Sequence, residues 1–274
     1  MRETLILLIF FVITLLFSIY LGILTKKSIE KGEIEPVFKD PKDYRNSIYL
    51  LLLVLAGTIV LLFFMKTKFE MIRLMENVAL FFLISTTFSY FLPTILSIVI
   101  SISLLILSEV KRSQIIKNIC LFLSVSSASA LVGSSLDYKV TLLFFLLLSF
   151  YDFISVFITK HMVFIAEKLL SRPTALISVF PYKKERRVTF TRGKKKIKII
   201  ALGAGDYFVP AVLCVSLLEL GIKFSLLCVG FNTIMLFIIF YLINIREVAG
   251  PLPAIPFLFL SSILSLATGF LLFR

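Results

Sequence analysis

Residues 77–108 read NVALFFLISTTFSYFLPTILSIVISISLLILS, a stretch of 32 residues without one charged side chain. A helix crosses the hydrocarbon core of a bilayer with about 20 apolar residues, so this stretch is too long for a single span. Its apolar character is broken only between Tyr90 and Pro93. Because proline starts helices well and interrupts them badly, we predict a tight turn there between two membrane-spanning helices.

The rest of the chain has the same character. Of its 274 residues, 59% are hydrophobic and only 16% are charged. The charges gather in short stretches between long apolar runs, a composition that excludes a soluble globular protein. The excess of 29 basic over 16 acidic residues indicates loops that face anionic lipid rather than binding to nucleic acid.

Hydropathy windows of about 19 residues predict an all-α, polytopic membrane protein with nine transmembrane helices. We expect one membrane-embedded domain, residues 1–274, with helices one to five in 1–135 and helices six to nine, including a loop over 160–198, in 136–274. The first span is expected to remain in the protein, because its apolar stretch is too long for a signal peptide. The expected spans cover 5–24, 47–65, 77–91, 94–108, 115–135, 140–159, 199–219, 222–243 and 251–273.

The basic residues indicate the orientation of these helices. With nine spans, 20 of the Lys and Arg residues fall on the side that holds the N-terminus and residues 160–198, and nine fall on the other side. By the positive-inside rule, we expect a multi-pass cell-membrane protein whose N-terminus and 160–198 loop are cytoplasmic and whose C-terminus is outside.

Two aspartates stand within predicted spans, where an ionisable side chain is costly and therefore a candidate for function. Asp152 lies seven residues before the end of the sixth span, and Asp206 lies seven residues into the seventh. Both carboxyls are then about 10 Å below the cytoplasmic boundary. Antiparallel neighbouring helices would bring them face to face.

Two carboxyls close together in a low dielectric cannot both ionise, so they share one proton. The ionised member can take a proton from an attacking water, while the protonated member polarises a peptide carbonyl. This pair therefore predicts an aspartic protease. The simpler alternative is that each aspartate independently caps or bonds a neighbouring helix.

The residues around Asp206 favour a functional role. Gly203 and Gly205 remove two side chains just before it, which would let another backbone approach closely. Pro210 lacks the amide hydrogen that would otherwise bond the carbonyl of Asp206. A third candidate element, Gly-Pro-Leu-Pro-Ala-Ile-Pro at 250–256, places three prolines where the ninth span begins. We expect an unwound entry there that could hold an extended substrate by main-chain hydrogen bonds.

Taken together, Tyr-Asp in span six, Gly-Ala-Gly-Asp in span seven and Leu-Pro-Ala-Ile-Pro in span nine resemble the presenilin and signal peptide peptidase family of intramembrane aspartyl proteases. The resemblance covers the whole chain in span count and motif order. It implies that Asp152 and Asp206 are the catalytic pair, and that Pro253-Ala254-Ile255 stands for the family's Pro-Ala-Leu. Prepilin peptidases share a G-x-G-D aspartate, but they usually have lysine two residues after it, where this chain has Phe208.

The long loop has two predicted parts. Its first half is amphipathic, and we expect it to continue helix six along the inner membrane surface. In the second half, residues 188–190 and 196–198 alternate around Gly193 like a short hairpin, although a disordered basic loop is an equal alternative. We expect His161 to be an interfacial residue and Tyr151 to bond a catalytic carboxylate.

Cofactor chemistry is not expected. The chain has one histidine and three cysteines, and neither an HExxH nor a CxxC spacing, so it lacks the ligand set of a zinc protease. The partners we expect are transmembrane protein or peptide substrates and membrane lipids, and the sequence assigns no oligomeric state. Besides the protease, two readings stay open: a proton-coupled transporter or channel using the same aspartates, and a non-catalytic membrane chaperone.

Overall fold

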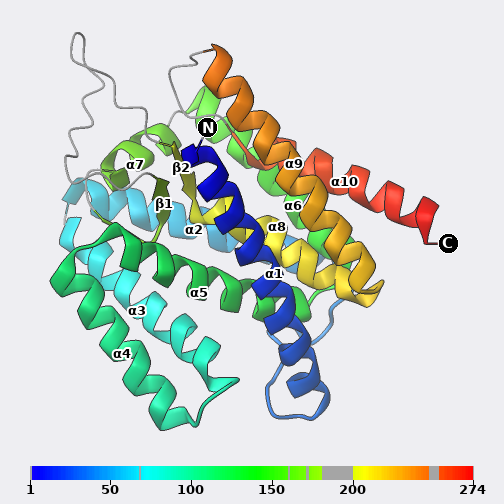
Figure 1. The fold of residues 1–274 in the computed structure, drawn as a ribbon, viewed down its shortest axis with the longest axis horizontal. Coiled ribbons are helices and arrows are strands. Elements are labelled where there is room, and N and C mark those ends of the chain that lie inside the picture. Colours follow the sequence, from blue (N-terminus) through cyan, green and yellow to red (C-terminus); the bar gives the residue numbers. More distant parts are fainter. Residues whose placement is uncertain are drawn as a thin grey trace.

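The computed structural model describes residues 2–67, 69–159, 161–170, 173–180, 200–246 and 253–273. These form a bundle of helices with one small sheet (Figure 1). The helices long enough to be compared with the predicted spans are α1 (Arg2–Glu30), α2 (Arg45–Thr67), α3 (Phe69–Ser89), α4 (Thr94–Lys111), α5 (Gln114–Ser134), α6 (Tyr138–Phe153), α8 (Ala204–Ser216), α9 (Ile222–Arg246) and α10 (Ile255–Leu272).

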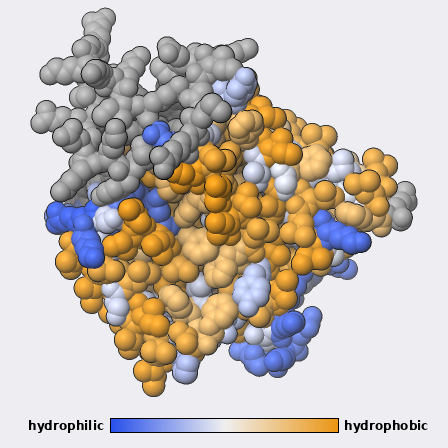
Figure 2. Space-filling model, in the orientation of Figure 1, coloured by the Kyte–Doolittle hydropathy of each residue, from blue (hydrophilic) through white to orange (hydrophobic). Residues whose placement is uncertain are grey.

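Large apolar side chains cover the outside of the bundle. Leu53, Ile95 and Val110 are exposed by 69%, 80% and 76%, a pattern that only a lipid environment satisfies. The face seen in Figure 2 is mainly apolar, with hydrophilic residues gathered toward its edges. Among the described residues, eight helices are long and apolar enough to cross a membrane, which confirms the all-α, multi-pass class but not the count of nine.

The turn predicted inside the long apolar stretch is present. α3 ends at Ser89 and α4 begins at Thr94, with Pro93 in an extended conformation (φ −54°, ψ 147°) as the N-cap. The amides of Phe91 and Leu92 both donate to the carbonyl of Phe88. These bonds close the end of α3 without requiring a donor from the proline.

The expected seventh span differs from the prediction. It begins as a strand, β2 (Ile200–Gly203), which pairs antiparallel with β1 (Ile177–Phe180) so that Ile177 faces Gly203 and Phe180 faces Ile200. Only then does α8 follow, with 13 residues, and it leads into the short 3-10 helix η2 (Leu217–Glu219). Hydropathy alone cannot separate a strand from a helix over four apolar residues, so this switch could not be predicted from the apolar pattern.

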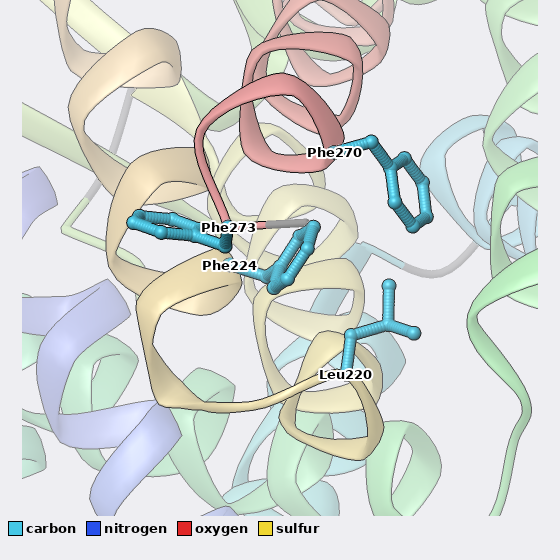
Figure 3. Close-up of a pocket in the computed structure, with 4 residues that line it drawn as sticks. All are labelled: Leu220, Phe224, Phe270 and Phe273. Atoms are coloured by element: carbon cyan, nitrogen blue, oxygen red, sulfur yellow. The ribbon is translucent and has the colours of Figure 1, made fainter.

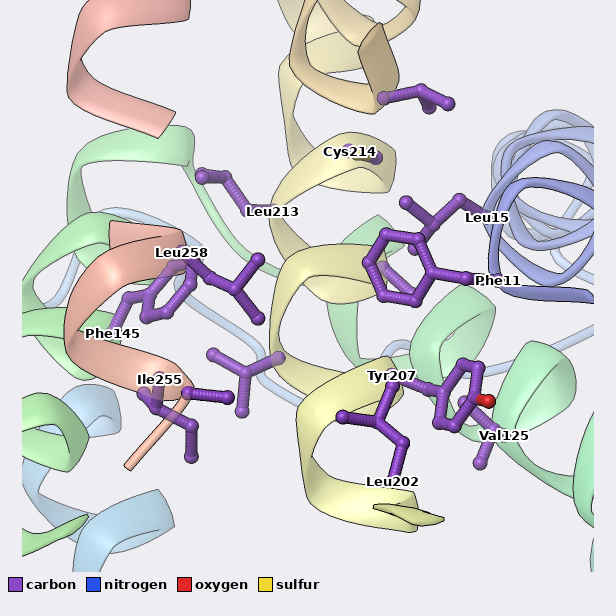
Figure 4. Close-up of a cluster of buried hydrophobic side chains, with 14 of the residues drawn as sticks. Phe11, Leu15, Val125, Phe145, Leu202, Tyr207, Leu213, Cys214, Ile255 and Leu258 are labelled. Carbon is purple, nitrogen blue, oxygen red and sulfur yellow. The ribbon is translucent and has the colours of Figure 1, made fainter. Parts of the chain in front are cut away.

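α8 is the central helix of the bundle. All its residues from Val209 to Ser216 are buried, and it packs against α1, α5, α6, α9 and α10. Two glycines let the neighbouring helices approach it closely: a Cβ on Gly22 of α1 or Gly133 of α5 would lie 2.6 Å from atoms of Val215 and Val212. Figure 4 shows apolar side chains from α1, α6 and α10 around this helix. α8 is therefore enclosed by protein, and its position is fixed from every side.

Helix six does not continue smoothly into the loop as expected. After Phe153 the chain forms a π-helix, η1 (Ile154–Ile158), and the separate helix α7 (His161–Leu170) follows. The amide of Thr159 donates to the carbonyl of Ile154, five residues earlier, which is the wider π-type turn. The inner side of α7, with Ile165 and Leu169, packs in an apolar cluster with residues of α2, α3 and β1. The predicted hairpin at 188–190 and 196–198 lies outside the described residues.

α9 and α10 are joined by a buried polar cluster. Asn232 of α9 accepts a hydrogen bond from Ser261 (2.8 Å) and donates to Ser262 (3.0 Å), both on α10. These side chains are at most 2% exposed. Hydrogen bonds of this kind fix one helix against another within a membrane protein.

Candidate active site

Asp152 lies at the end of α6, one residue before the last residue of that helix. Its side chain is buried, with 6% exposed. Within the described part of the chain, its Oδ2 atom has no hydrogen-bond partner. The backbone amide of Ile255, at the start of α10, lies near its carboxylate and stabilises negative charge on it. A buried carboxylate oxygen without a hydrogen-bond partner is unusual, and such atoms often have a catalytic role.

Asp206 is the third residue of α8 and caps the start of its own helix. The backbone amide of Gly203 donates to its Oδ2 atom at 3.2 Å, the half of a capping box in which an acidic side chain bonds back to the N-cap. A Cβ on Gly203 would lie 3.3 Å from that same oxygen. Glycine at this position therefore leaves room for the carboxylate itself, rather than for another backbone as the sequence suggested.

Gly205 has a different environment. A Cβ there would meet nothing within 4 Å, and the residue is exposed. No backbone of the described chain approaches it closely, so the predicted close packing is wrong at this position. The open space lies immediately before Asp206.

The two aspartates stand on neighbouring helices. α6 packs against α8, and α10 packs against both. Asp152 and Asp206 are close enough for the charge of one to act on the other. Three motifs that are 46 residues or more apart in the sequence thus meet in one place, at the end of α6 and the beginnings of α8 and α10.

The start of the ninth span is more regular than predicted. Pro253, Ala254 and Ile255 are all buried, but α10 begins at Ile255, and Pro256 lies in its first turn. Proline is tolerated there because the first amides of a helix have no partner inside it. The Ala254 carbonyl accepts from Leu258 (3.1 Å), so it is not free for a substrate. Residues 250–252 lie outside the described residues.

Tyr151 does not bond a catalytic carboxylate, and that prediction is wrong. Its hydroxyl donates to Thr58 Oγ1 (3.1 Å) and is hydrogen-bonded to His161 Nε2 (3.1 Å), because adjacent helical residues point in different directions. His161 Nδ1 is also hydrogen-bonded to Thr159 (2.5 Å). Burial lowers the pKa of His161 below its ordinary value. Tyr151 and His161 thus join α2, α6 and α7 beside the aspartates.

Several polar residues near the site escaped the sequence reading. Tyr207, directly after Asp206, shares a 2.7 Å hydrogen bond with Ser178 of β1. Lys117 of α5 and Glu76 of α3 form a buried ion pair (3.5 Å) with side chains 4% and 2% exposed. The pairing of Lys117 and Glu76 could have been suspected from the sequence, because a charge inside an apolar stretch is costly unless it is paired.

A cavity lies away from the aspartates. It has a volume of about 530 Å³ and is lined by Leu220, Phe224, Phe270 and Phe273, as Figure 3 shows. Leu220 follows η2, whereas Asp206 lies in the first turn of α8. The cavity has no polar lining side chain and contributes nothing to the site. The described residues also contain no cluster of three or more His, Cys, Asp or Glu side chains, so we assign no metal ligands.

Comparison with known proteins gives a consistent result. Two solved structures, described as a presenilin family intramembrane aspartate protease in the C222 and P2 space groups, share the fold at 20% sequence identity. Their TM-scores are 0.64 and 0.67, and the matches cover 95% and 96% of this chain and 96% of each of theirs. No curated protein matches the sequence significantly.

The sequence itself matches a family model over nearly its whole length. The model is that of signal-peptide peptidase, presenilin aspartyl protease, and the match covers residues 8–274. Nothing in these comparisons supports the alternative of a transporter or channel. The resemblance inferred from the three motifs is confirmed, and the chain belongs to the signal-peptide peptidase and presenilin family of intramembrane aspartyl proteases.

Proposed function

We propose that this protease hydrolyses peptide bonds in the transmembrane segments of other proteins with Asp152 and Asp206 as its catalytic dyad and water as the nucleophile. The observation that carries the proposal is that the buried Asp152 and the partly buried Asp206 come from different helices that pack together, close enough for one charge to act on the other. One of them, Asp152, has an oxygen with no hydrogen-bond partner among the described residues.

The chemistry follows from one shared proton. The ionised carboxyl takes a proton from water as the water oxygen attacks the peptide carbonyl, and the protonated carboxyl hydrogen-bonds that carbonyl oxygen. When the C–N bond breaks, a proton passes to the leaving amine. The free Oδ2 of Asp152 suits the water, because Asp206 Oδ2 is already held by the Gly203 amide.

The substrate must be extended where it is cut. A peptide bond within a helix has its carbonyl already bonded, and unwinding it in lipid costs several kcal/mol for each unpaired amide. A partner strand can offset this cost. β2 ends three residues before Asp206, and β1 pairs with one of its edges in the two-stranded sheet of the described residues. The other edge of β2 is our candidate for the docking edge.

We also propose that the N-terminus and residues 160–198 face the cytoplasm and that the C-terminus is outside. The support is the unequal distribution of the basic residues along the chain. Reporter fusions after Lys27 and at the C-terminus would test it, because the ends of α1 and α10 are then expected on the outer side. Signal from both fusions in the cytoplasm would contradict this orientation.

The dyad is tested by single substitutions in the purified protein. Asp152→Asn and Asp206→Asn are each expected to abolish cleavage of a single-span substrate in liposomes, because one carboxyl cannot serve as both base and acid. Asp43→Asn, in the exposed first loop, is the matched control and is expected to retain full activity. Either dyad variant with more than about a tenth of wild-type cleavage would contradict the assignment.

A further inference from the structure

Tyr207 follows the proposed catalytic Asp206 and is fully enclosed in the protein. Its side chain is 0% exposed, and its ring packs against Phe10 (centroids 5.7 Å apart) and Phe11 (5.5 Å) of α1. Figure 4 shows Tyr207 between α8 and α1 with its hydroxyl pointing away from the helix axis. These contacts keep the ring buried against α1, but they do not tie it to β1.

The hydroxyl of Tyr207 nevertheless has a specific partner. It lies 2.7 Å from Oγ of Ser178 in β1, which is also 0% exposed. The Ser178 hydroxyl also lies 3.2 Å from the carbonyl of Leu202 in β2, and when it donates its one hydrogen there, Tyr207 is the donor in the hydroxyl pair. Two hydroxyls thus connect the first turn of α8 to both strands of the sheet.

β1 is itself anchored to the helices on its other side. Gln114 of α5 donates through Nε2 to the carbonyls of Thr174 and Ile177, each at 3.0 Å. Glu76 of α3 accepts from the amide of Ala175 (2.7 Å) and from the Thr174 hydroxyl (3.1 Å). Gln114 and Glu76 are 0% and 6% exposed. The strand to which Tyr207 is bonded is therefore a fixed reference within the bundle.

The direction of Tyr207 also sets the direction of Asp206. Successive side chains on an α-helix are about 100° apart around its axis, so a bond that holds one of them toward β1 fixes where its neighbour points. We propose that the Ser178–Tyr207 hydroxyl pair positions the Asp206 carboxylate toward Asp152. This proposal rests on the dyad described above. In this proposal Ser178 and Tyr207 do not touch the substrate, and both are positioning residues.

The test uses the removal of single hydroxyls. Tyr207→Phe keeps the ring contacts, and Ser178→Ala removes the partner. Each is expected to lower kcat about tenfold, which is about 1.4 kcal/mol of activation free energy, because small misplacements of a catalytic group are costly. KM should stay unchanged. The affinity for a transition-state mimic that bears a hydroxyl should fall in step with kcat, which a purely structural role would not cause. The double variant should be no less active than the less active single variant, because both substitutions remove the Tyr207–Ser178 bond.

Tyr90→Phe is the matched control. Tyr90 shares a 2.7 Å hydrogen bond with Thr25, a residue of α1, in another hydroxyl pair between distant segments that lies outside the site. It should keep wild-type kcat and mimic affinity. Wild-type kcat in Tyr207→Phe, or equal losses in Tyr207→Phe and Tyr90→Phe, would overturn the proposal. If Tyr207→Phe does not fold, Ser178→Ala gives the decision by the same criteria. Activity in Asp206→Asn would instead refute the dyad, so the two failures are distinguishable.

Discussion

At the scale of single residues, the site depends on how little room surrounds the Asp206 carboxylate. One oxygen is bonded by the Gly203 amide, and a Cβ on that same glycine would lie 3.3 Å from it. On the other side, Gly205 opens to free space. The two glycines of the motif thus differ in their surroundings. Gly203 borders the carboxylate, and Gly205 borders open space that a substrate could enter.

Substitution of each glycine should separate these tasks. Gly203→Ala places a methyl group about 3.3 Å from Asp206 Oδ2 and is expected to lower kcat about tenfold by displacing the carboxylate. Gly205→Ala has space for its methyl group and should leave kcat and thermal unfolding unchanged while raising KM, because we propose that substrate occupies that space. Steady-state kinetics in detergent or liposomes measure both. A rise in KM for Gly203→Ala with unchanged kcat would contradict this division.

The pH dependence of cleavage should report the pair of aspartates. We expect a bell-shaped profile of kcat/KM whose two apparent pKa values belong to the dyad rather than to either residue. His161 is the other candidate for a titration near neutral pH. Because burial lowers its pKa, it is neutral at pH 7, and its protonated form is disfavoured in the fold. Stability from this group is therefore present at high pH and lost as pH falls.

His161→Gln distinguishes the two sources. It should leave both limbs of the rate profile in place and remove only part of the acid-induced loss of thermal stability. A profile whose limb disappears in His161→Gln would assign that limb to the histidine instead of the dyad.

At the scale of elements, the position of α10 matters most. Its first amide, at Ile255, lies beside the Asp152 carboxylate, and its depth is set by the bonds from Asn232 to Ser261 and Ser262. Proline at position 253 disfavours a helical conformation in the residue before it, which limits how far the helix can extend backward. The position of the Ile255 amide thus depends both on where α10 begins and on the hydrogen bonds of Asn232 with Ser261 and Ser262.

Pro253→Ala should weaken cleavage several-fold with little change in thermal unfolding. Alanine permits α10 to extend backward, which pairs its first amides within the helix and takes the Ile255 amide from Asp152. Pro93→Ala, at the N-cap of α4 and outside the proposed site, is the matched control, and it should keep most of the activity. Full activity in Pro253→Ala would contradict a role for the start of α10 in cleavage.

Loss of the hydrogen bonds between Asn232 and the two serines should lower the stability of the fold. Asn232→Ala leaves the hydroxyls of Ser261 and Ser262 without their shared partner and is expected to lower the free energy of unfolding by about 1–2 kcal/mol. Thr233→Val, one residue along α9, removes a hydroxyl that bonds only its own helix at 2.7 Å and should have a smaller effect. Thermal unfolding in one detergent compares them, and equal losses would show that no interhelical bond is special.

At the scale of the whole molecule, hydropathy and the cost of buried charge were sufficient for much of the structure. They located the break between α3 and α4, the membrane class and the two intramembrane aspartates, because each of these depends on local composition. They failed at Ile200–Gly203, where four apolar residues fit a strand as well as a helix, and at Tyr151, whose partners Thr58 and His161 come from other segments. Pairings between distant residues are decided by packing, and a single sequence does not contain them.

The substrate's own helix should control the rate. Gly or Pro placed near the inner boundary of a model span is expected to speed cleavage there, and Leu in the same places should slow it, because only the unwound segment can pair with a strand edge. A series of such substrates, matched in length and hydropathy, measures this. Equal rates across the series would rule out unwinding as the gate.

The central claim, hydrolysis by water activated between Asp152 and Asp206, is tested most directly by mass spectrometry of the cleavage products. A purified single-span substrate is incubated with the protease in liposomes prepared in water enriched in heavy oxygen. The account predicts one heavy oxygen in the new carboxyl terminus of the amino-terminal fragment, and no such fragment with Asp152→Asn or Asp206→Asn. The labelled fragment at more than about a tenth of the wild-type rate with either variant, or a wild-type product whose carboxyl terminus carries no label, would contradict it.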